Sequence, residues 1–293
     1  MKADLTYGSV ASEAAAAADD AARVAGLRIA EVEDIATLTT AAQLMDEVWS
    51  NGDAPPLISP STLKALAHSG GYVAVASSGH EIVGALIGFL GWHRGAVQLH
   101  SHILGVSPHR QGRAIGFALK QHQRAWALAR DIATITWTFD PLVRRNAYFN
   151  LTKLGAAITA YYENFYGDMT DAINSGDESD RVLVEWDLVA PSVAAFSHRR
   201  GAEPDIDDVR AHGGSIVLSV ADDGAPIAGG PDPSGPLLIQ VPEDIISVRE
   251  RSPESARRWR RALRATFGRA ISDGYAARGM SRSGWYILEH RRG

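Results

Sequence analysis

Residues 97–119 read VQLHSHILGV, then SPHR, then QGRAIGFAL, and this stretch decides the fold. Alternating apolar residues predict a strand that ends at Ser107-Pro108, and a basic, glycine-containing loop then leads into a helix. A strand that feeds a loop at a helix start gathers free backbone N–H groups at the positive end of the helix dipole. Arg110 and Arg113 add positive charge beside this loop. The stretch therefore predicts a binding site for a phosphate or pyrophosphate group.

Two common phosphate loops are excluded. The lysine-bearing P-loop requires GxxxxGK[ST], and the chain contains no Gly-Lys pair. The dinucleotide fingerprint requires three glycines at fixed offsets, whereas only two glycines lie near this turn. The segment instead resembles the acyl-CoA-binding motif of the GNAT family of N-acetyltransferases, Q/R-x-x-G-x-G/A. Ala114 stands where the family usually has its first glycine. The motif aligns with six residues, which the resemblance implies bind the pyrophosphate: Gln111, Gly112, Arg113, Ala114, Ile115 and Gly116.

A second block of sequence lies downstream. Residues 132–137, IATITW, predict a buried strand, and TFDP at 138–141 predicts a turn after it. Residues 144–155, RRNAYFNLTKLG, then predict a short helix that ends at Gly155. GNAT enzymes are similar, because they have a strand and an asparagine-bearing helix in this order after the pyrophosphate loop.

The match to the family within this helix is partial. Asn146, Leu154 and Gly155 correspond to the family's asparagine and its terminal Leu-Gly, but Ala156 replaces the usual aromatic residue. The resemblance implies that Asn146 contacts the pantetheine arm or caps the helix. The tyrosine that often protonates the leaving thiolate in this family corresponds to Leu151, so no catalytic acid is carried over at that position.

The flanking segments predict the same architecture. Strands are expected at 27–30, 71–77, 81–92 and 181–188, and helices at 34–49 and 61–68. The resemblance implies an α/β (α+β) fold with a GNAT-like mixed, mostly antiparallel central sheet flanked by helices, over residues 26–190. It also implies an opening between residues 102–106 and 136–140, where the backbone of Leu104, Gly105 and Val106 would align the pantetheine and donate to the thioester carbonyl.

Two further regions lie outside this domain. Residues 1–25 are rich in alanine and acidic residues, and we expect a frayed helix or a disordered tail. Residues 191–293 predict a smaller C-terminal α/β lobe, with strands at 216–220, 236–241 and 285–288 and a helix from 252 to about 273. We expect this lobe to shape the acceptor cleft or to form a homodimer contact.

Composition narrows the classes of function. The chain has 293 residues, 45% of them hydrophobic, which is enough for a full core. No run of about 18 apolar residues predicts a membrane span, and no basic-then-apolar N-terminus predicts a secretory signal, so we expect a cytoplasmic protein. A net charge of −5 gives no support to nucleic-acid binding. The absence of cysteine excludes a cysteine acyl-enzyme, so acyl transfer would be direct from donor to acceptor.

His100 and His102 lie on one face of the strand before the loop, because strand side chains alternate. One hypothesis is that either imidazole takes the proton from the acceptor amine, directly or through water, since it titrates near neutral pH. A second is that the pair ligates a metal, although a third ligand at recognisable spacing is missing. A third is that both are hydrogen-bonded packing residues. We expect no metal.

Two residues of the downstream block are further catalytic candidates. Asp140 follows the predicted strand at the mouth of the opening, where a carboxylate can hold a cationic amine or simply form the turn before Pro141. Tyr148 lies nearly one helical turn before Leu151 and is a candidate acid, with core packing as the favoured alternative. The aromatic and acidic segment 161–181 predicts a loop over the cleft or a solvated hairpin tip.

Together these observations predict an acyl-CoA-dependent N-acyltransferase, with acetyl-CoA as the favoured donor and an amine of a small molecule as the acceptor. An alternative is a non-catalytic acyl-CoA-binding sensor or scaffold with the same fold, which Leu151 supports. A metal hydrolase built on His100 and His102 is a third hypothesis. The sequence does not identify the acceptor.

Overall fold

The computed structural model describes residues 7–49, 56–93, 95–167, 178–230 and 235–291. The chain forms two compact units, one of Met1–Trp137 with Asp187–His198 and one of Thr138–Trp186 with Arg199–Gly293. This division runs across the boundary that we placed at residue 190. Of the expected loop 161–181, residues 168–177 lie outside the described residues.

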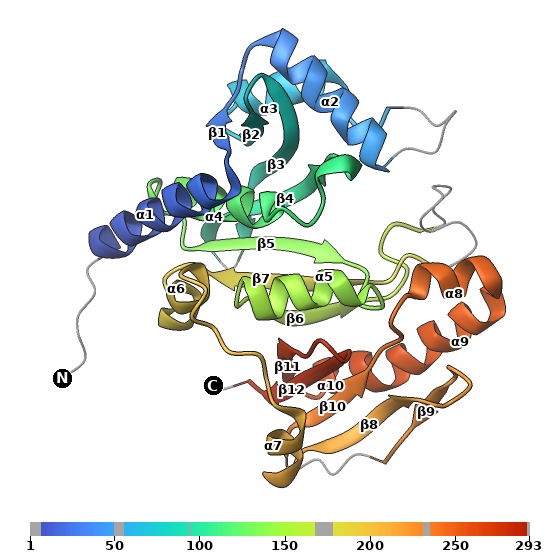
Figure 1. The fold of residues 1–293 in the computed structure, drawn as a ribbon. Helices are drawn as coiled ribbons and strands as arrows, with labels where there is room; N and C mark the ends of the chain where they lie inside the picture. The colour runs from blue at the N-terminus through green and yellow to red at the C-terminus, as the bar shows by residue number, and fades with distance from the viewer. Residues whose placement is uncertain (1–6, 50–55, 94, 168–177, 231–234, 292–293) are drawn as a thin grey trace. The chain divides into compact units, whose positions relative to one another are not determined.

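The first unit is built around a mixed sheet with the strand order β1-β2-β3-β4-β5 (Figure 1). Neighbouring strands are antiparallel except β4 and β5, which are parallel. This arrangement confirms the predicted mixed, mostly antiparallel sheet. Its elements are α1 (Tyr7–Ala25), β1 (Arg28–Glu31), α2 (Ile35–Trp49), α3 (Pro60–His68), β2 (Tyr72–Ser78), β3 (Glu81–His93), β4 (Ala96–Val106), the 3₁₀ turn η1 (Pro108–Arg110), α4 (Ile115–Leu128), β5 (Thr134–Phe139, in this unit as far as Trp137) and α6 (Pro191–Ser197).

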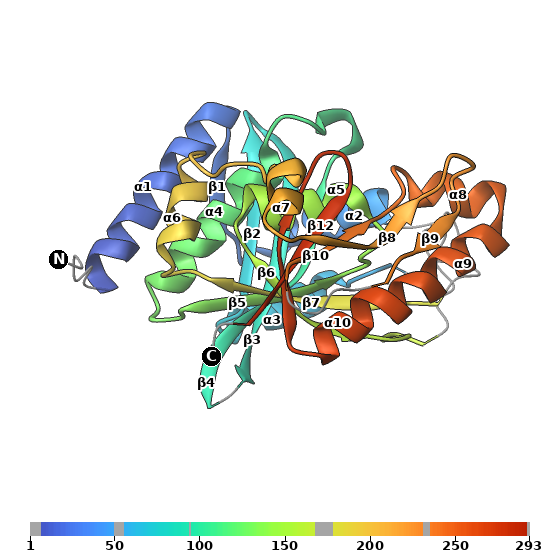
Figure 2. The same ribbon diagram turned by 90° about the horizontal axis from the view of Figure 1, so that it is seen from below.

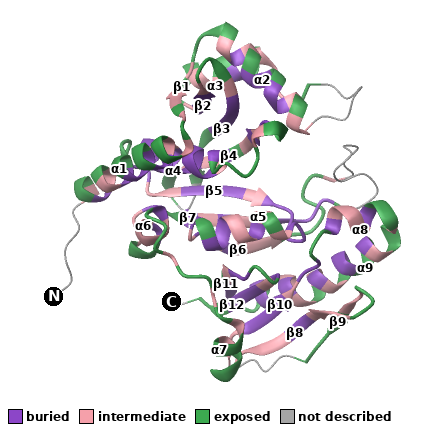
Figure 3. Ribbon diagram, in the orientation of Figure 1, coloured by how far each residue is buried: buried purple, intermediate pink, exposed green. Residues whose placement is uncertain are grey.

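Helices α2 and α3 begin where local capping chemistry predicts. The carboxylate of Asp34 accepts a hydrogen bond from the backbone N–H of Thr37 at 2.9 Å, and Ser59 caps α3 through the N–H of Thr62. The buried face of α2 then packs against the sheet and forms the core of this part of the unit (Figure 3). The fully buried members of this core include Leu38, Ala41, Met45, Ala85 and Ile87.

Helix α1 differs from the expectation of a frayed or disordered segment. Its buried side chains are small, and the helix packs against α4 in both ribbon views (Figures 1 and 2). The helix is ordered because small residues line one of its faces and let α1 and α4 approach closely. These residues are Ala14, Ala17, Ala18 and Ala21. Arg124, fully buried on α4, is held by the carboxylate of Glu13 on α1 at 2.8 Å.

Strand β4 carries a bulge at the histidine pair. Ile87 of β3 pairs with Ile103, whereas the next residue, Gly88, pairs with Ser101, so β4 has one extra residue, His102, at this point. On its other side β4 pairs with β5 only at Leu99–Ile135 and His100–Thr136. Within the described residues of this unit, the two strands therefore separate after His100, immediately before the bulge.

Gly88 is needed for the bulge, and its replacement gives a test. A Cβ atom at Gly88 would lie 2.9 Å from the backbone carbonyl oxygen of His100, which cannot move without shifting β4. We expect Gly88→Ala to lower the free energy of unfolding by about 1–3 kcal/mol. Urea denaturation measures this loss, and Gly91→Ala is the matched control in β3, because no described atom lies within 4 Å of a Cβ there. Equal stabilities of the two variants would contradict this account of the bulge.

The second unit contains a sheet with the order β7-β6-β11-β12-β10-β8-β9, antiparallel except for the parallel pair β8 and β10. The elements of this unit are α5 (Arg144–Tyr148), the π-helical turn η2 (Phe149–Lys153), β6 (Ala157–Tyr162), β7 (Arg181–Asp187), α7 (Ile206–Ala211), β8 (Ser215–Val220), β9 (Pro226–Ala228), β10 (Leu237–Gln240), α8 (Ile245–Arg251), α9 (Pro253–Leu263), the π-helical turn η3 (Arg264–Gly268), α10 (Arg269–Ser272), β11 (Tyr275–Met280) and β12 (Trp285–His290). Of these, β6, β9, β11 and α8 were not expected from the sequence.

No helix within the described ranges combines the length and apolar character that crossing a membrane requires.

Candidate functional site

The loop between β4 and α4 is open to solvent. Residues 111–114 are exposed, and Ile115, the first residue of α4, is buried. Ala114 adopts a left-handed conformation with φ of 59°, and its side chain provides no cap for the helix. The first-turn N–H groups of an α-helix lack intrahelical partners, so at α4 they remain available to a ligand. The structure thus forms the exposed, uncapped helix start that the sequence predicted.

Close packing fixes this helix start against the sheet. Gly84 of β3 faces α4, and a Cβ atom there would lie 2.9 Å from the Cγ2 atom of Ile115 and 3.1 Å from the Cδ1 atom of Leu119. The missing side chain lets the first turn of α4 approach β3. The N-terminal amides of α4 therefore have a rigid position relative to the end of β4.

The left-handed backbone at Ala114 predicts an unusual gain in stability. An L-residue in this conformation is strained by about 1–2 kcal/mol, whereas glycine is not. We expect Ala114→Gly to raise the free energy of unfolding by about 1 kcal/mol. Urea denaturation measures the change, and Ala16→Gly, at an exposed position inside α1, serves as a control that should lose about as much. A loss of stability in Ala114→Gly would contradict the left-handed conformation.

The two arginines of the loop have different surroundings. Arg110 is paired with Glu81 of β3, with 2.6 Å between its Nη2 and the carboxylate Oε2. Arg113 is exposed and forms no ion pair with any residue that the structure describes. Arg113 is therefore the cation of the loop that is available to a phosphate, while Arg110 is already partly neutralised.

The end of β4 has one free edge. Leu104, Gly105 and Val106 pair with β3 on one side, and in the described part of the first unit no residue of β5 pairs with them on the other. Helix α2 lies close beneath, because a Cβ at Gly105 would be 2.8 Å from the sulfur of Met45. Free N–H and C=O groups along this edge can pair with the amides of an extended ligand.

His100 and His102 are together, as the alternation of β4 predicted. Both rings contact Phe89 of β3, with centroids 5.0 and 5.7 Å from the phenyl ring. His100 is half-buried and lies 3.3 Å from the hydroxyl of Thr136, whereas His102 is exposed. Burial, helped by the charges of His102 and Lys120, lowers the pKa of His100 to about 4, and partial burial lowers the pKa of His102. Both imidazoles are therefore neutral at pH 7.

A buried lysine that the sequence analysis did not single out lies near this pair. Lys120 of α4 is 4% exposed, and its ammonium donates to the hydroxyl of Ser101 at 2.8 Å and to the amide oxygen of Gln123 at 3.3 Å. Burial lowers the pKa of Lys120 to about 7. The sequence gives little signal for it, since Lys120 is followed by Gln121, and Gln123 and Arg124 lie one turn further along α4, so no continuous apolar stripe marks the position as buried.

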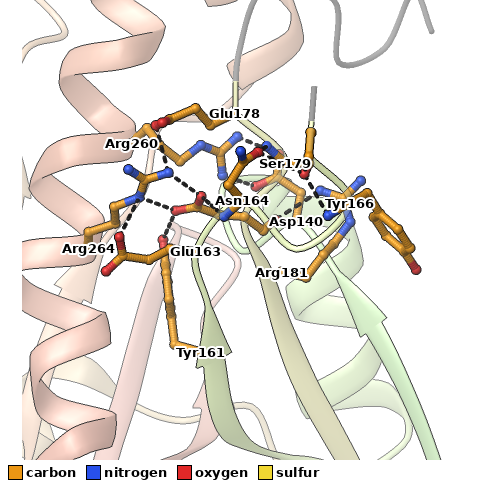
Figure 4. Close-up of polar contacts among 12 residues, drawn as sticks. Asp140, Tyr161, Glu163, Asn164, Tyr166, Glu178, Ser179, Arg181, Arg260 and Arg264 are labelled. Carbon is orange, nitrogen blue, oxygen red and sulfur yellow. Dashed lines mark hydrogen bonds and ion pairs between the residues drawn. The ribbon is translucent and has the colours of Figure 1, made fainter. Parts of the chain in front are cut away.

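Asp140 lies in the second unit and is surrounded by arginines (Figure 4). Arg260 forms a bidentate pair with it at 2.8 and 2.9 Å, Arg249 contacts the same carboxylate, and the N–H of Leu142 donates to Oδ1 at 2.9 Å. Burial alone would raise the pKa of this carboxyl, but Arg260 and Arg249 outweigh it and hold the pKa well below the usual range. These contacts favour the structural alternative for Asp140, a turn-forming carboxylate, over a role in holding an amine.

Neighbouring polar residues of the second unit form a similar network. Asp180 is fully buried and accepts from the hydroxyl of Tyr161 at 2.6 Å, from the N–H of Asn164 at 3.0 Å and from Arg264. Figure 4 labels these three partners. Arg264 also pairs with Glu178 at 2.6 Å. Polar residues at the described ends of segment 161–181 are thus bound to one another and to Arg264 of η3.

The other candidates from the downstream helix also lie in the second unit. The hydroxyl of Tyr148 donates to Glu203 at 3.0 Å and accepts from Arg282 at 3.1 Å. Asn146 is half-buried in α5, and Leu151 is completely buried. Tyr148 is therefore a half-buried residue with polar partners rather than part of an apolar core. Among the described residues, no cluster of three or more potential ligands forms a metal site around the histidines or elsewhere.

Comparison with known families agrees with this geometry. Residues 13–155 match the family model described as "Acetyltransferase (GNAT) family". Through this segment the chain belongs to the GNAT acetyltransferase family, which confirms the resemblance inferred from the pyrophosphate loop. The match begins inside α1, so that helix is part of the family segment.

Solved structures with similarity to the chain cover about half of it. They include an acetyltransferase of the GNAT family from Streptococcus pneumoniae, 14% identical, which covers 54% of this chain and 97% of its own with a TM-score of 0.44. The ribosomal-protein-S18-alanine N-acetyltransferase from Escherichia coli is 15% identical, with coverages of 56% and 95% and a TM-score of 0.45. An aminoglycoside 6'-acetyltransferase type Ii is 19% identical, with coverages of 56% and 98% and a TM-score of 0.44. No curated protein sequence matches the chain.

Proposed function

We propose that the protein is an acyl-CoA-dependent N-acyltransferase that transfers the acyl group directly to an amine of a small molecule. The observation that carries the proposal is the exposed, uncapped start of α4 beside the free edge of β4. The family match over residues 13–155 supports the same reaction class.

The residues of the first unit fit a CoA ester. The first-turn amides of α4 and the guanidinium of Arg113 are suited to the pyrophosphate, because the amides lie at the positive end of the helix dipole and the guanidinium is exposed in the adjoining loop. The free edge at 104–106 is suited to the amides of the pantetheine arm. When bound, an acyl-CoA supplies a thioester, whose carbonyl carbon is the electrophile. Holding both reactants in one site accounts for much of the rate enhancement, and N–H donors of β4 aimed at the carbonyl oxygen account for more.

Of the two imidazoles, His102 is the better candidate for the general base. It is exposed on the bulge of β4, at the point where β4 leaves β5, and it is neutral at pH 7. A neutral imidazole accepts the proton that the amine loses as it attacks. His100 is more buried and is engaged by Thr136, which suits a supporting role.

Binding of CoA tests the proposal directly. Isothermal titration with CoA should give a dissociation constant that Arg113→Ala raises about tenfold, because a charge-assisted hydrogen bond to phosphate is lost. Arg23→Ala, at an exposed position on α1, should leave the constant unchanged. Absence of CoA binding by the wild-type protein would overturn the proposal.

One observation favours a second candidate function, a non-catalytic acyl-CoA-binding sensor. The family's acid position is the buried Leu151, and the hydroxyl of the nearest candidate replacement, Tyr148, is held by Glu203 and Arg282. Release of CoA thiol from acyl-CoA across a panel of small amines and N-terminal peptides separates the two functions. Turnover with small amines supports our proposal, turnover with peptides alone overturns the choice of acceptor, and tight binding without turnover supports the sensor.

A further inference from the structure

The ammonium group of Lys120 bridges the two strands that separate in the first unit. It donates to Ser101 of β4 at 2.8 Å, and it lies 3.8 Å from the ring centroid of Trp137 in β5. The last β4–β5 pair is His100 with Thr136, so Ser101 and Trp137 are the first residues beyond it on each strand. The ammonium group therefore lies at the apex of the opening.

In the described part of the chain, the charge of Lys120 has no carboxylate partner. Among the residues that the structure describes, no Asp or Glu forms an ion pair with it, and its side chain is almost completely buried. A buried ammonium group is costly unless an anion compensates it. Its contacts with a hydroxyl, an amide oxygen and an aromatic ring satisfy hydrogen bonds but leave the charge uncompensated.

A second buried donor lies beside Lys120. The side chain of Gln123 is completely buried, and its Nε2 atom has no hydrogen-bond partner among the described residues, although its Oε1 atom accepts from Lys120. Buried amide N–H groups without an acceptor are rare in folded proteins. An ammonium group that lacks a compensating anion, beside an amide N–H that lacks an acceptor, matches the two oxygens of a carboxylate.

From this geometry we infer that Lys120, with Gln123, binds a carboxylate at the free end of the acyl group, and that the preferred donor is a dicarboxylic acyl-CoA such as malonyl- or succinyl-CoA. This inference rests on the proposed function, because it requires the acyl end of the donor to reach the apex from the edge of β4. It refines the choice of donor, for which acetyl-CoA is the reference. A carboxylate there would compensate the buried charge, which an acetyl group would leave unpaired.

The dissociation constants of acyl-CoA esters test the inference, and no acceptor amine is needed for this measurement. Isothermal titration would compare succinyl-CoA with butyryl-CoA, which has the same number of acyl carbons but no charge. For the wild-type protein we expect succinyl-CoA to bind at least about tenfold more tightly. In Lys120→Met the preference should disappear or reverse, because the apolar side chain cannot compensate the carboxylate. Lys64→Met, at an exposed position of α3, should retain it.

The outcomes separate this inference from the proposed function. Failure of CoA itself to bind overturns both. Binding of CoA with equal affinities for succinyl- and butyryl-CoA overturns the inference alone, as does an unchanged preference in Lys120→Met. The wild-type comparison is decisive even if Lys120→Met does not fold, and the ratio of two ligands cancels any general damage to the CoA site.

Discussion

Asp140→Asn is expected to lower the free energy of unfolding by about 3–5 kcal/mol, because it leaves buried guanidinium groups without their carboxylate. Arg260 is 1% exposed and Asp140 is 7% exposed, so water cannot replace the lost partner. Arg249, on the same carboxylate, is also buried. Removing one partner of a buried ion pair is costlier than losing a surface pair, since the remaining charges stay desolvated.

Urea denaturation at pH 7 measures this loss. Asp207→Asn is the matched control, because the side chain of Asp207 is 92% exposed and its pair with Arg210 lies on the surface. That control should change stability by less than about 0.5 kcal/mol. If Asp140→Asn is as stable as the control and instead weakens acceptor binding, Asp140 has the role at the cleft that the sequence first suggested.

His102→Ala is expected to lower kcat by about 10²–10⁴-fold if His102 is the general base of the proposed reaction. The acid limb of the kcat/KM profile should lie below pH 6.5 in the wild-type protein. The imidazole of His102 acts as a base only when it is neutral, so activity falls as the pH drops through its pKa. Because the pKa of His102 is lowered, this fall lies on the acid side of the ordinary histidine value. The limb should vanish from the residual activity of the variant.

Steady-state kinetics with acyl-CoA and the best amine of the panel provide the measurement. His212→Ala, on the exposed surface of the second unit, should keep the wild-type kcat. His100→Ala should retain more activity than His102→Ala, because His100 is half-buried and hydrogen-bonded to Thr136. An unchanged kcat in His102→Ala would exclude this residue as the base, while the CoA site would be unaffected.

Much of the first unit could be predicted because its signals are local. Asp34 and Ser59 cap helices through N–H groups three residues away, and the alternation in β4 places His100 and His102 on one face. The motif at 111–116 needs only a strand, a turn and a helix start to form its amide cluster. The expectation that residues 1–25 form a frayed helix or a disordered tail was wrong for α1, and the reason is physical. The small side chains of α1 stabilise it only by packing against α4, which lies far away in the sequence.

The sequence by itself determined the turn between β4 and α4, the order of the elements on either side of it and the family, because these depend on backbone hydrogen bonds and side-chain periodicity over a few residues. Only the tertiary structure decided what the charged candidates do. Asp140 is neutralised by arginines 109 and 120 residues further along the chain, and Lys120 lies between strands contributed by two different segments. Burial and ion pairing set the charge state and role of such groups, and both depend on partners that are distant in the sequence.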